Sequence, residues 1–182
     1  MKSVMISIRP EWCRKILNGE KMIEIRKSAP RITPPFKCYI YCTQGRETLS
    51  YEQYCGYDMQ NFTEDFVGNQ KVVGEFICDK ITPIRVFGNG TIQDWNSNRL
   101  KDSCLPYDEI AMYIGTNRLG CAWHISNLKV YEKPLDITEF YGHCDKGVLF
   151  DCSFCHEYST QTSCRQLTKP PQSWCYVENK EE

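Results

Sequence analysis

Three charged side chains near the amino terminus have the types and spacing of a small polar site. Lys21, Glu24 and Arg26 follow the turn-forming residue Gly19, within the segment Gly19–Lys27. Lysine is a mobile cation whose pKa falls readily on desolvation, and arginine offers a planar fork for a phosphate, a carboxylate or a base edge. A carboxylate between them can orient either cation, accept a proton or bind a ligand amine. The alternative is a surface strand with ion pairs, each of which contributes little.

Four cysteines near the carboxyl terminus form a second candidate site, a structural zinc site. They are Cys144, Cys152, Cys155 and Cys164, and the middle two form a C-x-x-C motif. Four soft ligands in a short stretch suit tetrahedral zinc and leave no open position for a catalytic water. The bound ion would order a loop that has few apolar residues of its own. A loop with free thiols or a disulfide is the alternative.

The composition is that of a folded globular protein, with 41% hydrophobic and 25% charged residues. The length suits one hydrophobic core, so we expect a single domain over residues 1–182. The net charge of −1 is unevenly distributed: residues 1–37 carry nine Lys or Arg against three Glu, a net of +6, so the remainder carries −7. Such a basic segment can bind a phosphate or a nucleic-acid backbone locally, or it can be a solvated face.

The apolar segments are too short for membrane insertion or export. No apolar run approaches the roughly 20 residues that cross a bilayer, and the stretch Val4–Ile8 is shorter than the core of a signal peptide. We therefore expect a cytoplasmic protein without membrane contact. In that compartment most of the 12 cysteines would be reduced and buried.

The elements that position the three charged side chains can be predicted from apolar spacing. Val4–Ile8 predicts a short buried strand. A helix is expected to begin at Pro10, whose missing N–H would be unpaired in a first turn, and to end at Gly19. The alternating segment Lys21–Lys27 predicts a second strand, which places the glutamate and the arginine on one face.

The rest of the chain predicts a mixture of strands and one further helix. Strands are expected over Lys37–Cys42, Val72–Cys78 with a continuation towards Ile84, Cys121–Tyr131 and Trp174–Val177, and a helix over Leu105–Gly115. Polar stretches near 44–70 and 144–168 predict insertions, and Phe87–Ser103 is expected to be irregular. Strands of mixed length around two short helices predict an α+β fold with a barrel-like sheet.

The segment G-E-K-M-I-E-I-R at Gly19–Arg26 resembles the signature G-x-K-x-x-E-x-R of the ASCH domain, a small β-barrel of the PUA-like superfamily. In that family the signature follows a strand and a helix that begins as Arg9-Pro10 does here. Three later segments are similar to the family's remaining strands: Val73–Phe76, Ala122–Leu128 and Pro171–Val177. The resemblance implies a PUA-like mixed β-barrel with two short helices and loop insertions.

One function that the resemblance implies is hydrolysis. Some small ASCH proteins are amidohydrolases of acylated cytidines that use a lysine, a threonine nucleophile and a glutamate. Lys21 and Glu75 match the lysine and the glutamate, but Glu24 occupies the nucleophile's position, and Ser28 and Thr33 are hydroxyls nearby in the sequence. Because a carboxylate cannot simply replace the hydroxyl, the enzymatic alternatives are a water-activating amidohydrolase or a ribonuclease. Glu24 or Glu75 would then act as general base, and Lys21 would stabilise the oxyanion.

The other implied function is binding of RNA, a nucleotide or a modified nucleoside, and we favour it over catalysis. The ligand-binding residues in this hypothesis are Arg9, Lys21, Glu24, Arg26 and Lys27. Trp12, Tyr39, Tyr41 or an aromatic residue of the insertion near 44–70 would stack on a base, as aromatic side chains do in proteins that bind single-stranded RNA. A protein-interaction module whose insertions form the binding surface is the third hypothesis.

Overall fold

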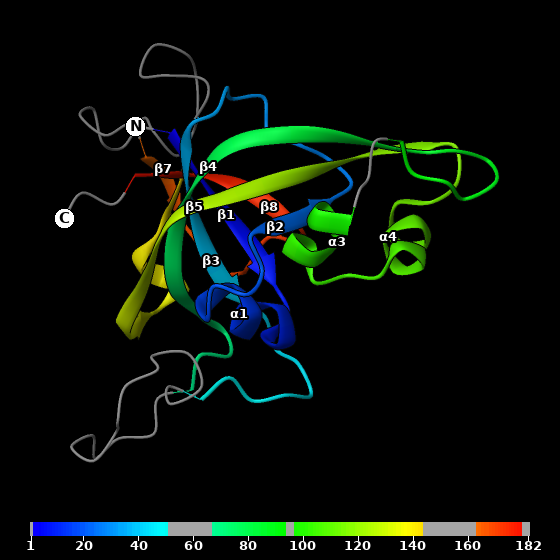
Figure 1. The fold of residues 1–182 in the computed structure, drawn as a ribbon. Coiled ribbons are helices and arrows are strands. Elements are labelled where there is room, and N and C mark those ends of the chain that lie inside the picture. The colour runs from blue at the N-terminus through cyan, green and yellow to red at the C-terminus, as the bar shows by residue number, and fades with distance from the viewer. Residues whose placement is uncertain (1, 51–66, 94–96, 144–162, 180–182) are drawn as a thin grey trace, which may run out of the picture.

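The computed structural model describes residues 2–50, 67–93, 97–143 and 163–179 (Figure 1). The elements in this part of the chain are β1 (Lys2–Ile8), α1 (Pro10–Leu17), β2 (Ile23–Arg26), β3 (Phe36–Cys42), β4 (Lys71–Val86), α3 (Ser97–Ser103), α4 (Tyr107–Ile114), β5 (Arg118–Leu135), the 3-10 helix η1 (Ile137–Glu139), β6 (Tyr141–His143), β7 (Ser163–Gln166) and β8 (Trp174–Glu178). The fold is α+β and consists mostly of sheet, in agreement with the sequence pattern.

The eight described strands form one mixed sheet in the order β2-β5-β4-β3-β1-β8-β6-β7. β1 and β3 are parallel, and the other neighbouring strands are antiparallel. Register shifts in the β3–β4 and β4–β5 pairs accompany the strong curvature of these strands (Figure 1). β2 and β7 end the strand order and do not pair with each other, so the described sheet is open. The closed barrel that we predicted is therefore not confirmed.

β4 and β5 are the longest strands and extend beyond the rest of the sheet (Figure 1). The predicted continuation of β4 towards Ile84 is confirmed, since the strand runs to Val86. Near their far ends, Ile84 and Val86 belong to an apolar cluster with Ile110 and Ile114 of α4. This packing fixes α4 against the end of the sheet that also carries β2.

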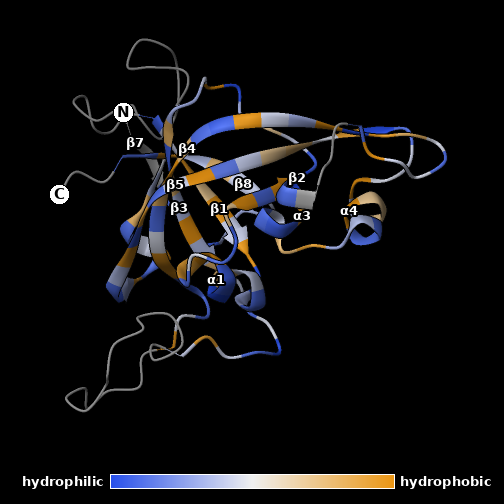
Figure 2. Ribbon diagram, in the orientation of Figure 1, coloured by the Kyte–Doolittle hydropathy of each residue, from blue (hydrophilic) through white to orange (hydrophobic). Residues whose placement is uncertain are grey.

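Two further apolar clusters fill the interior on opposite faces of the sheet. The first lies between the sheet and α1 and includes Ile16, Phe76 and Trp123, together with five buried cysteines that are free thiols: Cys13, Cys38, Cys42, Cys78 and Cys121. The other includes Met5, Tyr39 and Phe140. The alternation of apolar and polar residues along the strands is visible in Figure 2. The two clusters give the central strands β1, β3, β4 and β5 an apolar contact on each face of the sheet.

Four elements of the described chain were not predicted: α3, the 3-10 helix η1, β6 and β7. α3 lies within Phe87–Ser103, which was expected to be irregular. The helix was missed because its sequence S-N-R-L-K-D-S has one apolar residue and no helical period. The short strands β6 and β7 likewise lack an apolar alternation. Among the described residues, no helix has the length and apolar character needed to span a bilayer.

Candidate functional site

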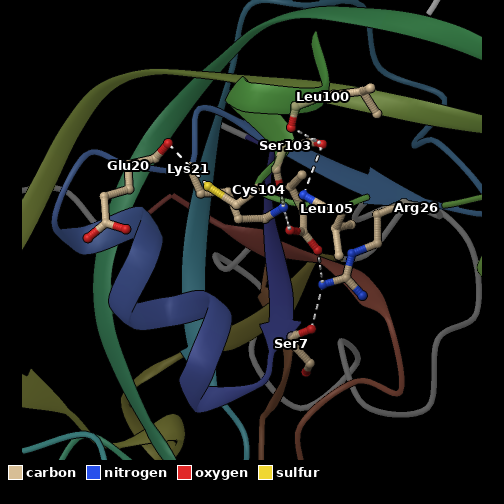
Figure 3. A network of polar contacts seen from close by, with 9 residues as sticks. Ser7, Glu20, Lys21, Arg26, Leu100, Ser103, Cys104 and Leu105 are labelled. Atoms are coloured by element: carbon tan, nitrogen blue, oxygen red, sulfur yellow. Dashed lines mark hydrogen bonds and ion pairs between the residues drawn. The ribbon is translucent and has the colours of Figure 1, made fainter. Parts of the chain in front are cut away.

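The turn between α1 and β2 directs Lys21 into the interior. Gly19 adopts the left-handed conformation, with φ of 74°, and the N–H of Lys21 donates to the carbonyl of Lys15 at 3.0 Å. The Lys21 side chain is only 1% exposed as a result. Its Nζ donates a hydrogen bond to the carbonyl of Ser103 at the end of α3 (Figure 3). A cation that the sequence placed at the start of a strand is thus held inside the protein.

Glu24 and Arg26 project from the same face of β2, because side chains alternate along a strand, and the isoleucines of the strand pack on the opposite face. Glu24 Oε2 lies 3.6 Å from Lys21 Nζ, and Glu24 Oε1 lies 3.1 Å from Arg26 Nη2. Arg26 Nη2 also donates to the carbonyl of Ser7 in β1, at 2.6 Å. One buried carboxylate is therefore shared between two buried cations.

The three charged side chains line a cavity of about 480 Å³, a volume within the range of ~300–1,000 Å³ that is typical of small-molecule sites. Other residues that line it include Ser7, Arg9, Glu11, Trp12, Thr43, Glu109, Tyr113 and Gln172. The lining contains three cations and three carboxylates. Because these charges balance, the cavity suits a polar ligand with both donors and acceptors better than a bare anion.

Burial lowers the pKa of Lys21, and the carboxylate of Glu24 opposes that shift. Desolvation has this effect because an isolated ammonium loses its hydration inside the protein. Lys21 therefore becomes a neutral amine at a lower pH than a surface lysine does, and this amine can exchange a proton with a bound group.

The structure separates the three aromatic residues that we named for stacking. Trp12 lines the cavity, and Lys21 Nζ lies 5.2 Å from the centre of its ring. Tyr39 and Tyr41 are buried in the cluster on the opposite face of the sheet. The expectation that either tyrosine stacks on a ligand was therefore wrong, because successive residues of β3 alternate between faces and both tyrosines point away from the cavity.

Of the remaining predicted site residues, the structure brings Arg9 to the cavity but not Lys27 or Glu75. Arg9 is exposed and lines the cavity. Lys27 is exposed outside it, with its Nζ 5.0 Å from the centre of the Tyr113 ring. The Glu75 carboxylate lies 3.0 Å from Lys37 Nζ and accepts a hydrogen bond from the Tyr131 hydroxyl at 2.6 Å.

The position of Glu75 follows from strand register. Glu75 is opposite Tyr39, whose side chain belongs to the cluster with Met5 and Phe140. Glu24 is opposite Trp123, whose side chain belongs to the cluster between the sheet and α1. Directly opposed residues share a face of the sheet. The two glutamates thus lie on different faces, and the hypothesis that Glu75 acts as general base beside Lys21 is corrected.

The hydroxyl groups of the cavity differ from those considered in the sequence. Ser28 accepts a hydrogen bond from Trp174 Nε1 at 3.1 Å, and neither Ser28 nor Thr33 lines the cavity. Thr43 and Ser7 do line it. Thr43 follows β3 directly, and only the parallel pairing of β1 with β3 brings these two residues together. No local sequence signal marks either of them.

The predicted zinc ligands Cys144, Cys152 and Cys155 lie outside the described residues, and the fourth, Cys164, is in β7. Within the described ranges, no group of three or more His, Cys, Asp or Glu side chains is placed to bind a metal ion. The zinc site therefore stays a prediction.

The fold has counterparts among crystal structures of ASCH from Zymomonas mobilis. One such structure is 16% identical to this chain, covers 97% of it and 87% of its own chain, and has a TM-score of 0.56. Two structures of mutant forms of the same protein give TM-scores of 0.57 and 0.55, with 16% and 15% identity, 97% and 98% of this chain covered, and 88% and 91% of theirs. No family model and no curated protein matches the sequence. The chain therefore has the fold of the ASCH domain, in agreement with its sequence signature.

Proposed function

We propose that this protein of ASCH fold binds a nucleobase in the cavity, presented by single-stranded RNA, a nucleotide or a modified nucleoside. The observation that carries the proposal is the buried trio Lys21, Glu24 and Arg26 in the wall of a cavity of about 480 Å³. Buried charged groups are unfavourable unless they are paired. Three of them beside a cavity support a ligand with complementary hydrogen-bonding groups.

The polar groups suit a base that carries both an amine and a carbonyl. A glutamate accepts a hydrogen bond from the exocyclic amine of cytosine, and Glu24 is the buried acceptor of this cavity. Arg26 Nε is buried without a hydrogen-bond partner among the described residues, so it is a donor that a ligand carbonyl could satisfy. The ring of Trp12 offers a stacking surface. Cytosine and its modified forms have this combination of groups.

The test is calorimetric titration of cytidine, N4-acetylcytidine, uridine and a short RNA into wild type, Glu24→Gln and Glu75→Gln. Glu75 is the matched control, because it is also a little-exposed carboxylate paired with a cation but lies on the other face of the sheet. We expect Glu24→Gln to weaken binding of the preferred base about tenfold and Glu75→Gln to leave it unchanged. Trp12→Leu, which removes the ring but keeps an apolar side chain on α1, gives a second measurement if Glu24→Gln folds poorly.

Two results would reject the proposal. If the wild-type protein binds none of the four ligands, the proposal of nucleobase binding is rejected altogether. Equal effects of the two glutamine variants would show that the ligand does not contact the cavity.

Hydrolysis of an acylated cytidine-type nucleoside is a second candidate, favoured by the distance of 3.6 Å between Lys21 Nζ and Glu24 Oε2, which places a cation beside a carboxylate in the same cavity. In this reaction Glu24 would take a proton from water as the water oxygen attacks the acyl carbon, and Lys21 would stabilise the resulting oxyanion. The protonated Glu24 would then return the proton to N4 as the C–N bond breaks, which releases cytidine and the free carboxylic acid. Mass spectrometry of N4-acetylcytidine incubated with the protein tests it. Cytidine that forms with wild type and not with Lys21→Ala would support hydrolysis, and unchanged substrate would exclude it.

A further inference from the structure

A second cavity, of about 390 Å³, adjoins the first at the start of α1. Arg9, Glu11 and Thr43 line both cavities. The rest of the second cavity is formed by Pro10 and the segment 44–47. The two hollows meet across the three shared residues, so a ligand longer than one nucleoside could occupy both.

The charges of the second cavity favour an anion. Arg9 and Arg46 are exposed, and neither guanidinium has an ionic or hydrogen-bond partner within the described ranges. Glu47 is paired with Arg14 at 2.8 Å, so its charge is compensated. Glu11 is the remaining acidic residue of the lining. Two free guanidinium groups against one free carboxylate leave a net positive charge where the cavities meet.

The segment that carries Arg46 is fixed to the start of α1. A Cβ atom at Gly45 would lie only 2.8 and 2.9 Å from Cδ and Cγ of Pro10, so the backbone packs directly on the proline ring. The N–H of Thr43 donates to the carbonyl of Ile8 at 2.8 Å. Because this wall is already in place, a ligand need not order it, and less binding free energy is lost on association.

We propose that the second cavity binds the phosphate and ribose of the nucleotide next to the base held in the first cavity. The ligand is then a single-stranded oligonucleotide rather than a free nucleoside. This inference rests on the proposed binding of a nucleobase. A guanidinium group matches phosphate with a planar fork of donors, and Arg9 and Arg46 are free to provide it.

The experiment compares a tetranucleotide with the nucleoside of the same base, by titration of wild type, Arg46→Ala and Arg31→Ala at low and moderate salt. Arg31 is the matched control, since it is an exposed arginine that lines neither cavity. We expect wild type to bind the tetranucleotide at least about tenfold more tightly than the nucleoside. Arg46→Ala should remove about three- to tenfold of that advantage and lower the salt slope by ~0.7. Its affinity for the nucleoside should not change.

The possible outcomes separate the two proposals. Equal wild-type affinity for the tetranucleotide and the nucleoside, or equal losses in Arg46→Ala and Arg31→Ala, would overturn the second binding site and leave base binding intact. Absence of binding to either ligand would overturn both.

Discussion

Glu24 compensates the charges of two buried cations at once. The small exposed fractions of all three side chains show that water cannot replace this compensation. Lys21 is 1% exposed, Glu24 7% and Arg26 8%. Lys21 retains the Ser103 carbonyl and Arg26 retains the Ser7 carbonyl if the carboxylate is removed. Neither carbonyl carries a full charge, so both cations would then be buried without compensation.

Glu24→Ala is therefore expected to lower the free energy of unfolding by about 3–5 kcal/mol, the usual cost of breaking a buried ion pair. Glu75→Ala should cost about 1 kcal/mol, because its partner Lys37 is 23% exposed and can be solvated. Urea denaturation of both variants at neutral pH measures the difference. Equal losses would mean that the trio is not electrostatically coupled.

The part of the site that is local in the chain could be predicted from the sequence. Lys21, Glu24 and Arg26 lie within six residues, so strand alternation and one turn are enough to place them. Thr43 and Gln172 reach the cavity from distant segments, and nothing in their neighbourhood marks them. Alternation assigns the residues of one strand to its two faces. It does not show which residues of another strand lie on the same face of the sheet.

At the scale of elements, the pairing of β4 with β5 determines how closely the sheet packs. Gly74 of β4 is opposite Val130 of β5. A Cβ atom at Gly74 would lie 2.6 Å from the carbonyl oxygen of Lys129, and this backbone oxygen cannot move without shifting the strand. Glycine is needed here because of this close approach of two backbones.

Gly74→Ala is accordingly expected to lower the free energy of unfolding by about 1–3 kcal/mol, the usual cost of forcing extra volume into a packed interior. Arg85→Ala, at an exposed position of the same strand, is the control and should change stability by less than about 0.5 kcal/mol. Thermal unfolding followed by circular dichroism compares the two. A stability equal to that of wild type in Gly74→Ala would show that the strands separate easily.

The zinc prediction belongs to the segment between β6 and β7. If Cys144, Cys152, Cys155 and Cys164 bind zinc, protein purified without added metal should contain about one equivalent per chain by elemental analysis. The double variant Cys152→Ser/Cys155→Ser should lose it. Cys104→Ser, a substitution outside this segment of the sequence, should retain it. Protein without metal whose thiols all titrate as free would contradict the prediction.

Elements with a clear apolar period could be predicted, and those without one could not. The helix that begins at Pro10 and the helix before Gly115 both occur where the sequence placed them. The α3 helix and the strands β6 and β7 are stabilised by contacts with the rest of the fold rather than by their own pattern. Tertiary contacts of this kind override local propensity.

For the whole molecule, the buried thiols determine how stability changes in alkaline solution. Burial raises the pKa of five described cysteines: Cys13, Cys38, Cys78, Cys121 and Cys175. For Cys78 the pKa rises from 9.0 to about 12, and for Cys175 to about 11. Above pH 9 the unfolded chain releases these protons while the folded protein keeps them. The stability present below pH 9 is therefore lost as the pH rises towards 12.

Cys78, whose pKa rises to about 12, is expected to lower the free energy of unfolding by about 1.4 kcal/mol per pH unit between pH 9 and 12, and Cys175 by about the same amount per unit between pH 9 and 11. Lys21 acts in the opposite sense, because its lowered pKa makes its contribution rise until pH 10.5, but it is one group against five. Urea denaturation under reducing conditions at pH 8, 9.5 and 10.5 measures the slope. Cys78→Ala should flatten it by about one proton, whereas Val73→Ala should lower stability equally at each pH. An unchanged slope in Cys78→Ala would contradict the assignment.

The hydrogen bond from Arg26 to the Ser7 carbonyl joins β2 to β1 across a gap that no backbone ladder spans in the described residues. Separation of β2 from β1 would break this hydrogen bond but none of the described strand pairs. A ligand that draws Arg26 Nη2 away from the Ser7 carbonyl exchanges one hydrogen bond for another, so any net gain in free energy at Arg26 comes from its unpartnered Nε.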